Sequence, residues 1–385
     1  MMGNVICVFR SIYRLTNHPI QRVTLSRIKF ILLFTAACFF VFAYPVWRFS
    51  HWAGESWQVG WPGVLLVWIA GFLGMQYSFA GPRLAVRYLV VHWMGISFVF
   101  ACVALAWEVL RLLVPIGDAR AAPWLFLTAL ILVMVAMMAS HHLQIRQFQI
   151  RSDKLVKSLR VVQISDVHIG SRQGRFMTRI VNRINALEPD FVLITGDLID
   201  SSAVEIDALR SLENLTGTTY FSVGNHERYA DLPKAIAMLE SLGVIPLRQE
   251  SRIAHGVQFI GIDDAEHHGQ VNRHLPDVGV RQDHFTILLY HRPLGWESAV
   301  RHGVDLMLSG HTHNGQIFPF NWIVRQQFNR IRGLHRDADC HLYVSVGTGT
   351  WGPLMRLGSL NEISCFDLLP PEAPLTANRS IRPKA

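Results

Sequence analysis

Five short polar clusters hold the side chains whose types could do chemistry in this sequence. Each cluster directly follows an apolar run. In chain order they are Asp166-Val-His168, Gly196-Asp197-Leu-Ile-Asp200, Gly224-Asn225-His226-Glu227, His291 and Gly310-His311-Thr-His313. Carboxylates, imidazoles and one amide oxygen, without a thiolate, form a mixed oxygen and nitrogen ligand set that suits divalent Mn, Fe, Co or Zn. The clusters therefore predict a metal site.

The elements that would position these clusters are short strands alternating with helices. Strands are expected at 160–165, 191–195, 219–223, 285–290, 305–309 and 342–346, and helices at 174–187, 203–215, 231–242 and 294–302. Several of these strands are apolar at consecutive positions, which predicts burial on both faces of a sheet in an α/β fold. Residues 143–150 alternate weakly and predict an additional edge strand. Because the carboxyl ends of strands in such folds meet at one edge, the clusters are expected to converge.

The series of clusters resembles the calcineurin-like metallophosphoesterase superfamily. The run Gly310–Gln316, with Tyr343–Gly349 and Pro353, is similar to a small bacterial phosphodiesterase-like branch, some members of which carry N-terminal membrane segments. The resemblance covers about residues 143–368 and implies an αββα sandwich, in which two mixed sheets are flanked by helices. Asn314 departs from the pattern, because this branch usually has a glycine at that position.

The resemblance also implies a site with two divalent metal ions. The ligands that it implies are Asp166, His168 and His313 for one ion, Asn225, His291 and His311 for the other, and Asp197 as the bridge. His226 would be catalytic and would face the substrate phosphate rather than bind metal. Glu227 has two interpretations, as a partner that holds the His226 ring or as a solvated acid at a helix start.

Two ions at such a site can lower the pKa of a shared water toward neutrality, so that hydroxide attacks phosphorus in line. The predicted activity is hydrolysis of a phosphodiester or pyrophosphate, including one carried by a lipid, while His226 donates a hydrogen bond or proton to the leaving oxygen. The alternative is a catalytically inactive scaffold or partner-binding module with the same fold, because a fold alone does not establish activity.

The N-terminal part of the chain predicts a membrane anchor. Half of the 385 residues are hydrophobic and only 17% are charged. Crossing a bilayer takes about 20 apolar helical residues. Four stretches approach that length without an internal charge, at 30–47, 61–80, 88–107 and 121–140. The expected organisation is a basic cytoplasmic segment at 1–29, a four-helix transmembrane anchor at 30–140, the metallophosphoesterase domain at 141–368 and a disordered tail at 369–385.

Charge predicts how the anchor is oriented. The excess of basic residues lies in residues 1–150, with 11 Lys and Arg against 3 Asp and Glu, whereas the rest of the chain has 25 of each. Basic residues concentrate before the first stretch, between the second and third, and after the fourth, which predicts both termini on the cytoplasmic side of a bacterial inner membrane.

A nucleic-acid partner is not expected, because the soluble part has no net basic charge. Five unpaired cysteines fit a reducing compartment.

Two further features have more than one interpretation. His92 lies within the third stretch and is expected to be an interfacial or helix-packing residue rather than part of a transport path. The segment Ile317–Arg332 interleaves Phe318, Phe320, Trp322 and Phe328 with Arg325, Arg330 and Arg332. That composition suits insertion at a lipid headgroup layer, and hence a membrane-borne substrate. Alternatively, the aromatic residues pack under the domain and the arginines are solvated.

Overall fold

A computed structural model describes residues 25–80, 84–265 and 269–371, which form two compact units. Among the described residues, the helical unit contains those up to Met138 together with Gly352–Leu357, and the sheet unit contains those of Ala139–Trp351 and of 358–371. Residues 1–24 and 372–385 lie outside the described part, so the predictions of a basic cytoplasmic segment and a disordered tail stay predictions.

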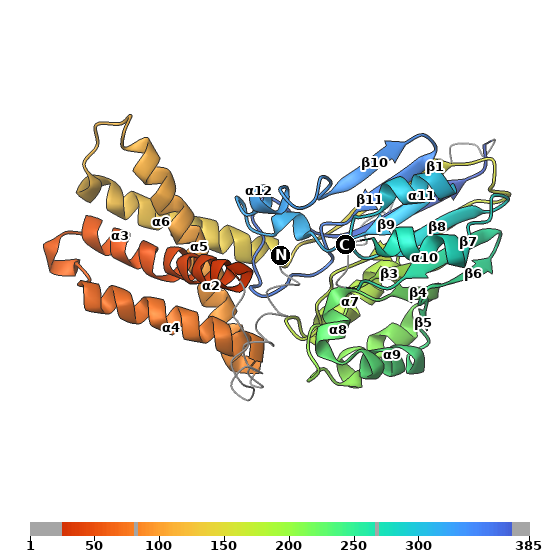
Figure 1. Cartoon of the computed structure of the whole chain (residues 1–385), viewed down its shortest axis with the longest axis horizontal. Helices are drawn as coiled ribbons and strands as arrows, with labels where there is room; N and C mark the ends of the chain where they lie inside the picture. Colours follow the sequence, from red (N-terminus) through yellow and green to blue (C-terminus); the bar gives the residue numbers. More distant parts are fainter. Residues whose placement is uncertain (1–24, 81–83, 266–268, 372–385) are drawn as a thin grey trace. The chain divides into compact units, whose positions relative to one another are not determined.

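The helical unit consists of long apolar helices (Figure 1). They are α2 (Leu25–Cys38), α3 (Tyr44–Trp52), α4 (Trp61–Ala80), α5 (Leu84–Leu110) and α6 (Asp118–Ala139), with a 3₁₀ turn at Glu55–Trp57. A π-helical segment, η1 (Phe39–Ala43), joins α2 to α3. It ends two residues before Pro45, which has no backbone N–H to continue the normal helical hydrogen bonds.

The prediction of four membrane spans is wrong by one. Three helices among the described residues are long and apolar enough to cross a membrane, namely Ile28–Trp52, Ala85–Leu110 and Asp118–Ala139. The second predicted stretch does form a helix, α4, of 20 residues. This helix begins with Trp-Pro-Gly, contains Gln76, Tyr77 and Ser78, and is not one of the three candidates. With three candidate spans, the prediction that both termini lie on one side no longer follows.

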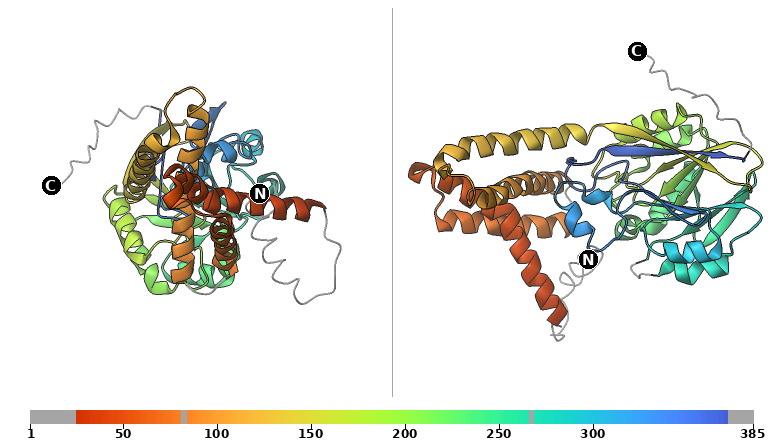
Figure 2. Two further views of the ribbon diagram at one scale, coloured as in Figure 1. Left: turned by 90° about the vertical axis from the view of Figure 1, so that its left-hand side faces the viewer. Right: turned by 90° about the horizontal axis from the view of Figure 1, so that it is seen from above.

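The sheet unit contains two six-stranded mixed sheets (Figure 2). The first has the order β1 (Leu143–Arg151), β12 (Asn361–Leu369), β2 (Leu159–Ile164), β3 (Phe191–Thr195), β4 (Thr218–Ser222) and β5 (Ile245–Pro246). The second has the order β10 (Gly333–Asp337), β11 (Cys340–Val344), β9 (Leu306–Ser309), β8 (Phe285–Tyr290), β7 (Val257–Ile262) and β6 (Glu250–Ala254). The neighbours β2, β3 and β4 are parallel, as are β7, β8 and β9, so their carboxyl ends share an edge in each sheet. The predicted edge strand is present as β1.

Side chains that alternate between the two faces of each strand explain why the two sheets pack as a sandwich. Val161 and Leu289 point into the core between the two sheets, whereas their neighbours Val162 and Leu288 point to the outer faces. Helices α7 (Gly174–Asn185) and α9 (Leu232–Ser241) pack on the outer face of the first sheet. Helices α10 (Gln270–Val278) and α11 (Trp296–His302) pack on that of the second. The predicted αββα architecture is therefore confirmed.

One predicted helix is absent. Residues 203–215 form two short 3₁₀ turns, at Ile206–Ala208 and Arg210–Asn214. Their apolar residues Ile206, Leu209, Leu212 and Leu215 recur every third position, which matches three residues per 3₁₀ turn better than the α-helical period. The short helices α8 (Asn225–Ala230) and α12 (Asn321–Val324) complete the unit.

Candidate metal centre

The predicted site residues lie just beyond the ends of five elements. Asp166 and His168 follow β2, Asp197 follows β3, Asn225 and His226 begin α8 after β4, His291 follows β8, and His311 and His313 follow β9 through the turn η5 (His313–Gly315). The first sheet thus supplies five of the eight residues and the second sheet three. Asp166, His168 and His291 are fully buried.

A first group of ligand atoms comes from Asp166, His168 and His313. The Nε2 atoms of the two histidines are 3.0 Å apart, and His313 Nε2 is 3.4 Å from Asp166 Oδ1. All three residues offer an atom within 4.8 Å of the others. This group matches one predicted ligand set.

A second group consists of Asp197, His291 and His311. Asp197 Oδ2 is 3.0 Å from His291 Nε2, which is 3.1 Å from His311 Nδ1. The same Asp197 oxygen is 4.0 Å from His168 Nε2, so this carboxylate lies between the two groups. That position is the one expected of a bridging residue.

The helix start at α8 contributes two further residues. Asn225 is buried, and its Oδ1 accepts no hydrogen bond from any described residue, so it has an unused lone pair. The backbone N–H of His226 donates to Asp197 Oδ1 at 2.8 Å, and His226 Nε2 is 3.9 Å from Asp197 Oδ2. His226 is also near enough to form a third group with His168 and Asp197, so distance alone permits it either role.

Backbone geometry explains why glycines accompany these side chains. A Cβ on Gly224 would collide with Asp197, and one on Gly310 would collide with Asp166. Five site residues have left-handed backbone, with φ between 48° and 69°: Asp166, His168, Asp197, His311 and His313. Such conformations are costly for residues other than glycine and cluster at functional sites. Asn314, which stands where the resemblance expects glycine, also has φ 50°, a conformation that asparagine tolerates.

The contacts of Glu227 agree with neither of the two interpretations given for it. It is fully buried, and its carboxylate accepts hydrogen bonds from the backbone N–H groups of Asp197, Leu198, Ile199 and Gly224 at 2.7–3.0 Å. Glu227 therefore fixes the loop that presents Asp197 rather than the His226 ring. Its acidic type at the helix start was visible in the sequence, but its partners are backbone atoms of a distant strand end.

Electrostatics favour an ionised Asp197 beside a protonated His291, with neutral imidazoles at His168 and His311. Burial lowers the pKa of His291, but Asp197 outweighs it and raises that pKa to about 10. Burial lowers the pKa of His168 and His311 well below the usual range. Burial raises the pKa of Asp166 to about 6. Burial also disfavours ionised Asp197, but His291 and His226 outweigh it and hold the pKa of that carboxyl well below its usual range. Neutral imidazoles and ionised carboxylates are the forms that bind metals.

The His291 ring is oriented by the main chain. Its Nδ1 is 2.8 Å from the carbonyl oxygen of Thr195 and therefore donates a hydrogen, which leaves Nε2 to face Asp197 and His311. Ser165 Oγ donates to Asp166 Oδ2 at 2.6 Å and orients that carboxylate in the same way. Nothing in the sequence marks Ser165 or Thr195 for these roles, because each is a strand residue whose role depends on a neighbouring chain segment.

Comparisons with known proteins bear directly on this site. The family model for calcineurin-like phosphoesterases matches residues 159–315. An uncharacterized metallophosphoesterase of Helicobacter pylori is 36% identical over 238 residues, which cover 59% of this chain and 64% of that protein. A metallophosphoesterase of Aquifex aeolicus, also uncharacterized, is 31% identical over 238 residues, covering 58% of this chain and 91% of that protein. The chain belongs to the calcineurin-like metallophosphoesterase family.

A third relative links this family membership to membrane helices. A zebrafish (Danio rerio) protein named as a transmembrane protein with a metallophosphoesterase domain is 32% identical over 303 residues, covering 69% of this chain and 68% of that protein. The chain nevertheless spans less than two thirds of the length of the Helicobacter protein. This chain likewise combines a metallophosphoesterase domain with apolar helices.

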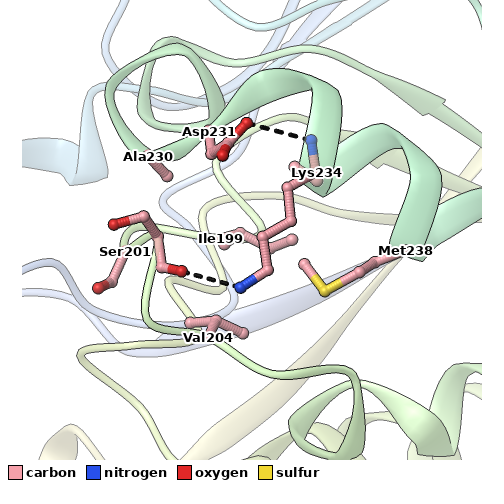
Figure 3. Close-up of a pocket in the computed structure, with 9 residues that line it drawn as sticks. Ile199, Ser201, Val204, Ala230, Asp231, Lys234 and Met238 are labelled. Carbon is pink, nitrogen blue, oxygen red and sulfur yellow. Dashed lines mark hydrogen bonds between the residues drawn. The ribbon is translucent and has the colours of Figure 1, made fainter.

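A small pocket of this metallophosphoesterase lies apart from the ligand groups. Figure 3 shows it between the loop after β3 and helix α9. Lys234 Nζ donates to the carbonyl oxygen of Ser202 at 3.0 Å, and Asp231 caps α9 by accepting from Lys234 N at 3.2 Å. None of the eight candidate site residues lines it. Its contacts secure the loop that follows Asp197.

Proposed function

We propose that the protein is a metal-dependent phosphoesterase with two divalent ions, Mn, Fe, Zn or Co, which hydrolyses a phosphodiester or pyrophosphate. Asp197 bridges the ions, and the other ligands divide between them as Asp166, His168 and His313, and Asn225, His291 and His311. The observation that carries the proposal is the Asp197 carboxylate, which lies between two groups of buried ligand atoms. The unused Oδ1 of Asn225 fits the same donor set.

Different residues of the chain have different roles at this centre. Divalent ions held here would supply Lewis-acid stabilisation of negative charge on the phosphoryl oxygens. His226 has a side chain that is 12% exposed, whereas that of His168 has no exposure. It can therefore reach a substrate and donate a hydrogen bond or proton to the leaving oxygen. Glu227 keeps Asp197 in place through the backbone.

The first test is hydrolysis of bis(p-nitrophenyl) phosphate by the purified full-length protein in detergent. We expect turnover that is lost on treatment with a chelator and restored by Mn²⁺ or another divalent ion, because the ligand set is complete. Release of p-nitrophenol and bound metal are measured on the same samples. Turnover that survives complete metal removal would contradict the proposal. A protein that binds no metal and has no turnover would favour the scaffold alternative.

The catalytic unit is proposed to face the cytoplasm of a bacterial inner membrane. Five basic residues follow the last candidate span closely: Arg146, Arg151, Lys154, Lys157 and Arg160. Basic segments next to spans are retained on the cytoplasmic side. We expect a reporter fused after residue 385 to be active only if it is of a cytoplasmic type. Activity of a periplasmic reporter at this position would reverse the orientation.

We also propose that the substrate phosphate is carried by a lipid. On and beside α12, Phe318, Trp322 and Ile323 are exposed, and the first two rings lie edge to face with centroids 5.2 Å apart. Arg325 is exposed beside them. Aromatic and aliphatic side chains with a neighbouring cation suit a headgroup layer. Phe328 does not belong to this surface, because it is buried with its ring centroid 5.4 Å from that of His311.

Two matched substitutions test the lipid proposal. Ile323 on α12 and Ile253 on β6 are 52% and 48% exposed, so Ile323→Ser and Ile253→Ser remove similar apolar surface. The substrates are a soluble methyl p-nitrophenyl phosphodiester and its long-chain alkyl analogue in phosphatidylglycerol vesicles. We expect Ile323→Ser alone to lose about fivefold to tenfold in rate, and only on the vesicle substrate, as loss of about 1 kcal/mol of apolar contact implies. Equal rates for both variants on both substrates would overturn the proposal.

A further inference from the structure

A short piece of the chain beyond β11 belongs to the helical unit. Residues Gly352–Leu357 lie in the connection from β11 to β12, yet they group with the membrane helices. The backbone N–H of Leu354 donates to His92 Nε2 on α5 at 3.0 Å, and that of Arg356 donates to the carbonyl oxygen of Ala136 on α6 at 2.7 Å. Met355 is fully buried. We call residues 352–357 the anchored segment.

His92 is specialised for this contact. Its Nδ1 is 2.7 Å from the carbonyl oxygen of Tyr88, one helical turn earlier, and donates a hydrogen to it. This leaves Nε2 unprotonated, as an acceptor for the Leu354 N–H. One turn further along α5, Gly95 makes room for the anchored segment, because a Cβ there would lie 2.8 Å from Pro353 Cβ and 2.9 Å from Met355 Sδ. The helix-packing interpretation of His92 thus extends to a segment of the same unit that lies in the connection from β11 to β12.

The residues just before the anchored segment reach the metal centre. Gly349 N donates to the carbonyl oxygen of Asp166 at 3.0 Å. Trp351 N donates to Gln316 Oε1 at 3.0 Å, and Gln316 Nε2 donates back to the Trp351 carbonyl oxygen at 3.0 Å. The Trp351 ring lies edge to face with the ring of His226, with centroids 5.8 Å apart. Trp351 is therefore bonded covalently to the anchored segment and contacts the proposed catalytic histidine.

We infer that α5 and α6 act through the anchored segment to position Trp351 beside His226, so that the membrane helices contribute to catalysis and not only to anchorage. A long connection between strands would otherwise be mobile. Holding 352–357 against two helices restricts Trp351, and misplacement of a substrate-facing group by about 1 Å can cost about 100-fold in rate. His92 and Trp351 are positioning residues in this scheme, which rests on the proposed function for its rate measurements.

The first experiment needs no catalytic activity. Hydrogen exchange is followed in the full-length protein in detergent for wild type, His92→Ala, His92→Gln and Gly117→Ala. His92→Ala removes the acceptor of the Leu354 N–H, so amide hydrogen exchange at Leu354 is expected to become faster. Exchange at the Gly349 N–H is expected to become faster too, because Gly349 is close to the released segment in the chain. His92→Gln retains an acceptor and is expected to restore protection. Gly117→Ala is the control, because nothing lies within 4 Å of a Cβ there. Unchanged exchange at Gly349 in His92→Ala would overturn the inference.

The second experiment measures kcat and KM on bis(p-nitrophenyl) phosphate. We expect His92→Ala and Gly95→Ala to lower kcat by about tenfold to 100-fold with unchanged metal content, and Gly117→Ala to match wild type. Alanine favours helix more than glycine, so a loss in Gly95→Ala does not reflect a weaker α5. In a Trp351→Ala background, His92→Ala is expected to have no further effect, because both act through one contact.

The outcomes separate the inference from the proposed function. Additive effects of His92→Ala and Trp351→Ala, or wild-type kcat in both His92→Ala and Gly95→Ala, would overturn the inference while leaving the metal-dependent activity intact. A wild-type protein without phosphodiesterase activity would contradict the proposed function. In that case, the exchange experiment still decides whether the membrane helices hold the Gly349–Trp351 region.

Discussion

Replacing Asp197 with alanine is expected to remove both metal ions and reduce phosphodiester hydrolysis to background. Asp197 Oδ2 lies near a ligand atom of each group, 3.0 Å from His291 Nε2 and 4.0 Å from His168 Nε2. Without it, each ion loses its shared anionic ligand, and the site loses the charge that favours two adjacent cations. Metal content by mass spectrometry and turnover of bis(p-nitrophenyl) phosphate are measured on the same preparation.

Two companion variants make this result interpretable. Asp197→Asn removes the negative charge but keeps a side-chain oxygen that can accept the hydrogen bond from His226 N, which is 2.8 Å from Asp197 Oδ1 in the wild-type structure. This variant therefore separates the effect of losing the charge from the effect of losing the side chain's shape. Asp207→Ala removes an exposed carboxylate that pairs with Arg210, three residues later, and is expected to behave as wild type. If Asp197→Ala retained its metal and full turnover, the assignment of a bridged two-metal centre would be wrong.

Replacing His226 with alanine is expected to preserve metal content and to lower kcat by about two to four orders of magnitude, the range for a lost general acid or charge stabiliser. Its backbone N–H, which contacts Asp197, survives the substitution. Its ring lies against the rings of His168 and Trp351, with centroids 4.7 and 5.8 Å away, on the side of the site that retains solvent exposure. The lost imidazole is therefore expected to affect the reaction more than the ligands.

Metal analysis distinguishes the two roles that distance permits for His226. Retained metal with slow turnover supports a catalytic role, whereas loss of metal would make His226 a ligand in the group with His168 and Asp197. His274→Ala on α10 is a matched control, since it removes the same ring from a helix on the outer face of the second sheet. Wild-type kcat in His226→Ala would contradict any catalytic role.

The chemistry of the site was predictable because its signals are local. Each cluster directly follows a strand that is apolar at consecutive positions, such as Val161-Val162 before Asp166 or Leu288-Leu289 before His291. Burial on both faces of a strand leaves a recognisable pattern, and a parallel sheet places strand ends at one edge. The sandwich and the convergence of the predicted residues follow from these patterns. The ligand roles stay predictions.

Predictions that depend on contacts between distant residues were absent or wrong. The sequence shows an acid at position 227, but only the tertiary structure places it under the backbone of residues 197–199. Phe328 has the composition of a lipid-facing residue, yet it packs on His311. The predicted number of spans was wrong because the second apolar stretch forms the helix α4, which is not among the three candidate spans of the described residues.

The sequence by itself determined which side chains have the chemistry of metal ligands, that they sit at strand ends, and that apolar helices precede them. These properties are set by residue type and by periods of two and 3.6, which neighbouring positions encode. Only the tertiary structure decided that Asp197 lies between two ligand groups and that residues 352–357 join the helical unit through His92 and Ala136. Those arrangements depend on contacts between residues that are far apart in the sequence, 29 and 94 positions for Asp197 and more than 200 for His92 and Ala136. No local pattern records which partner such a residue will meet.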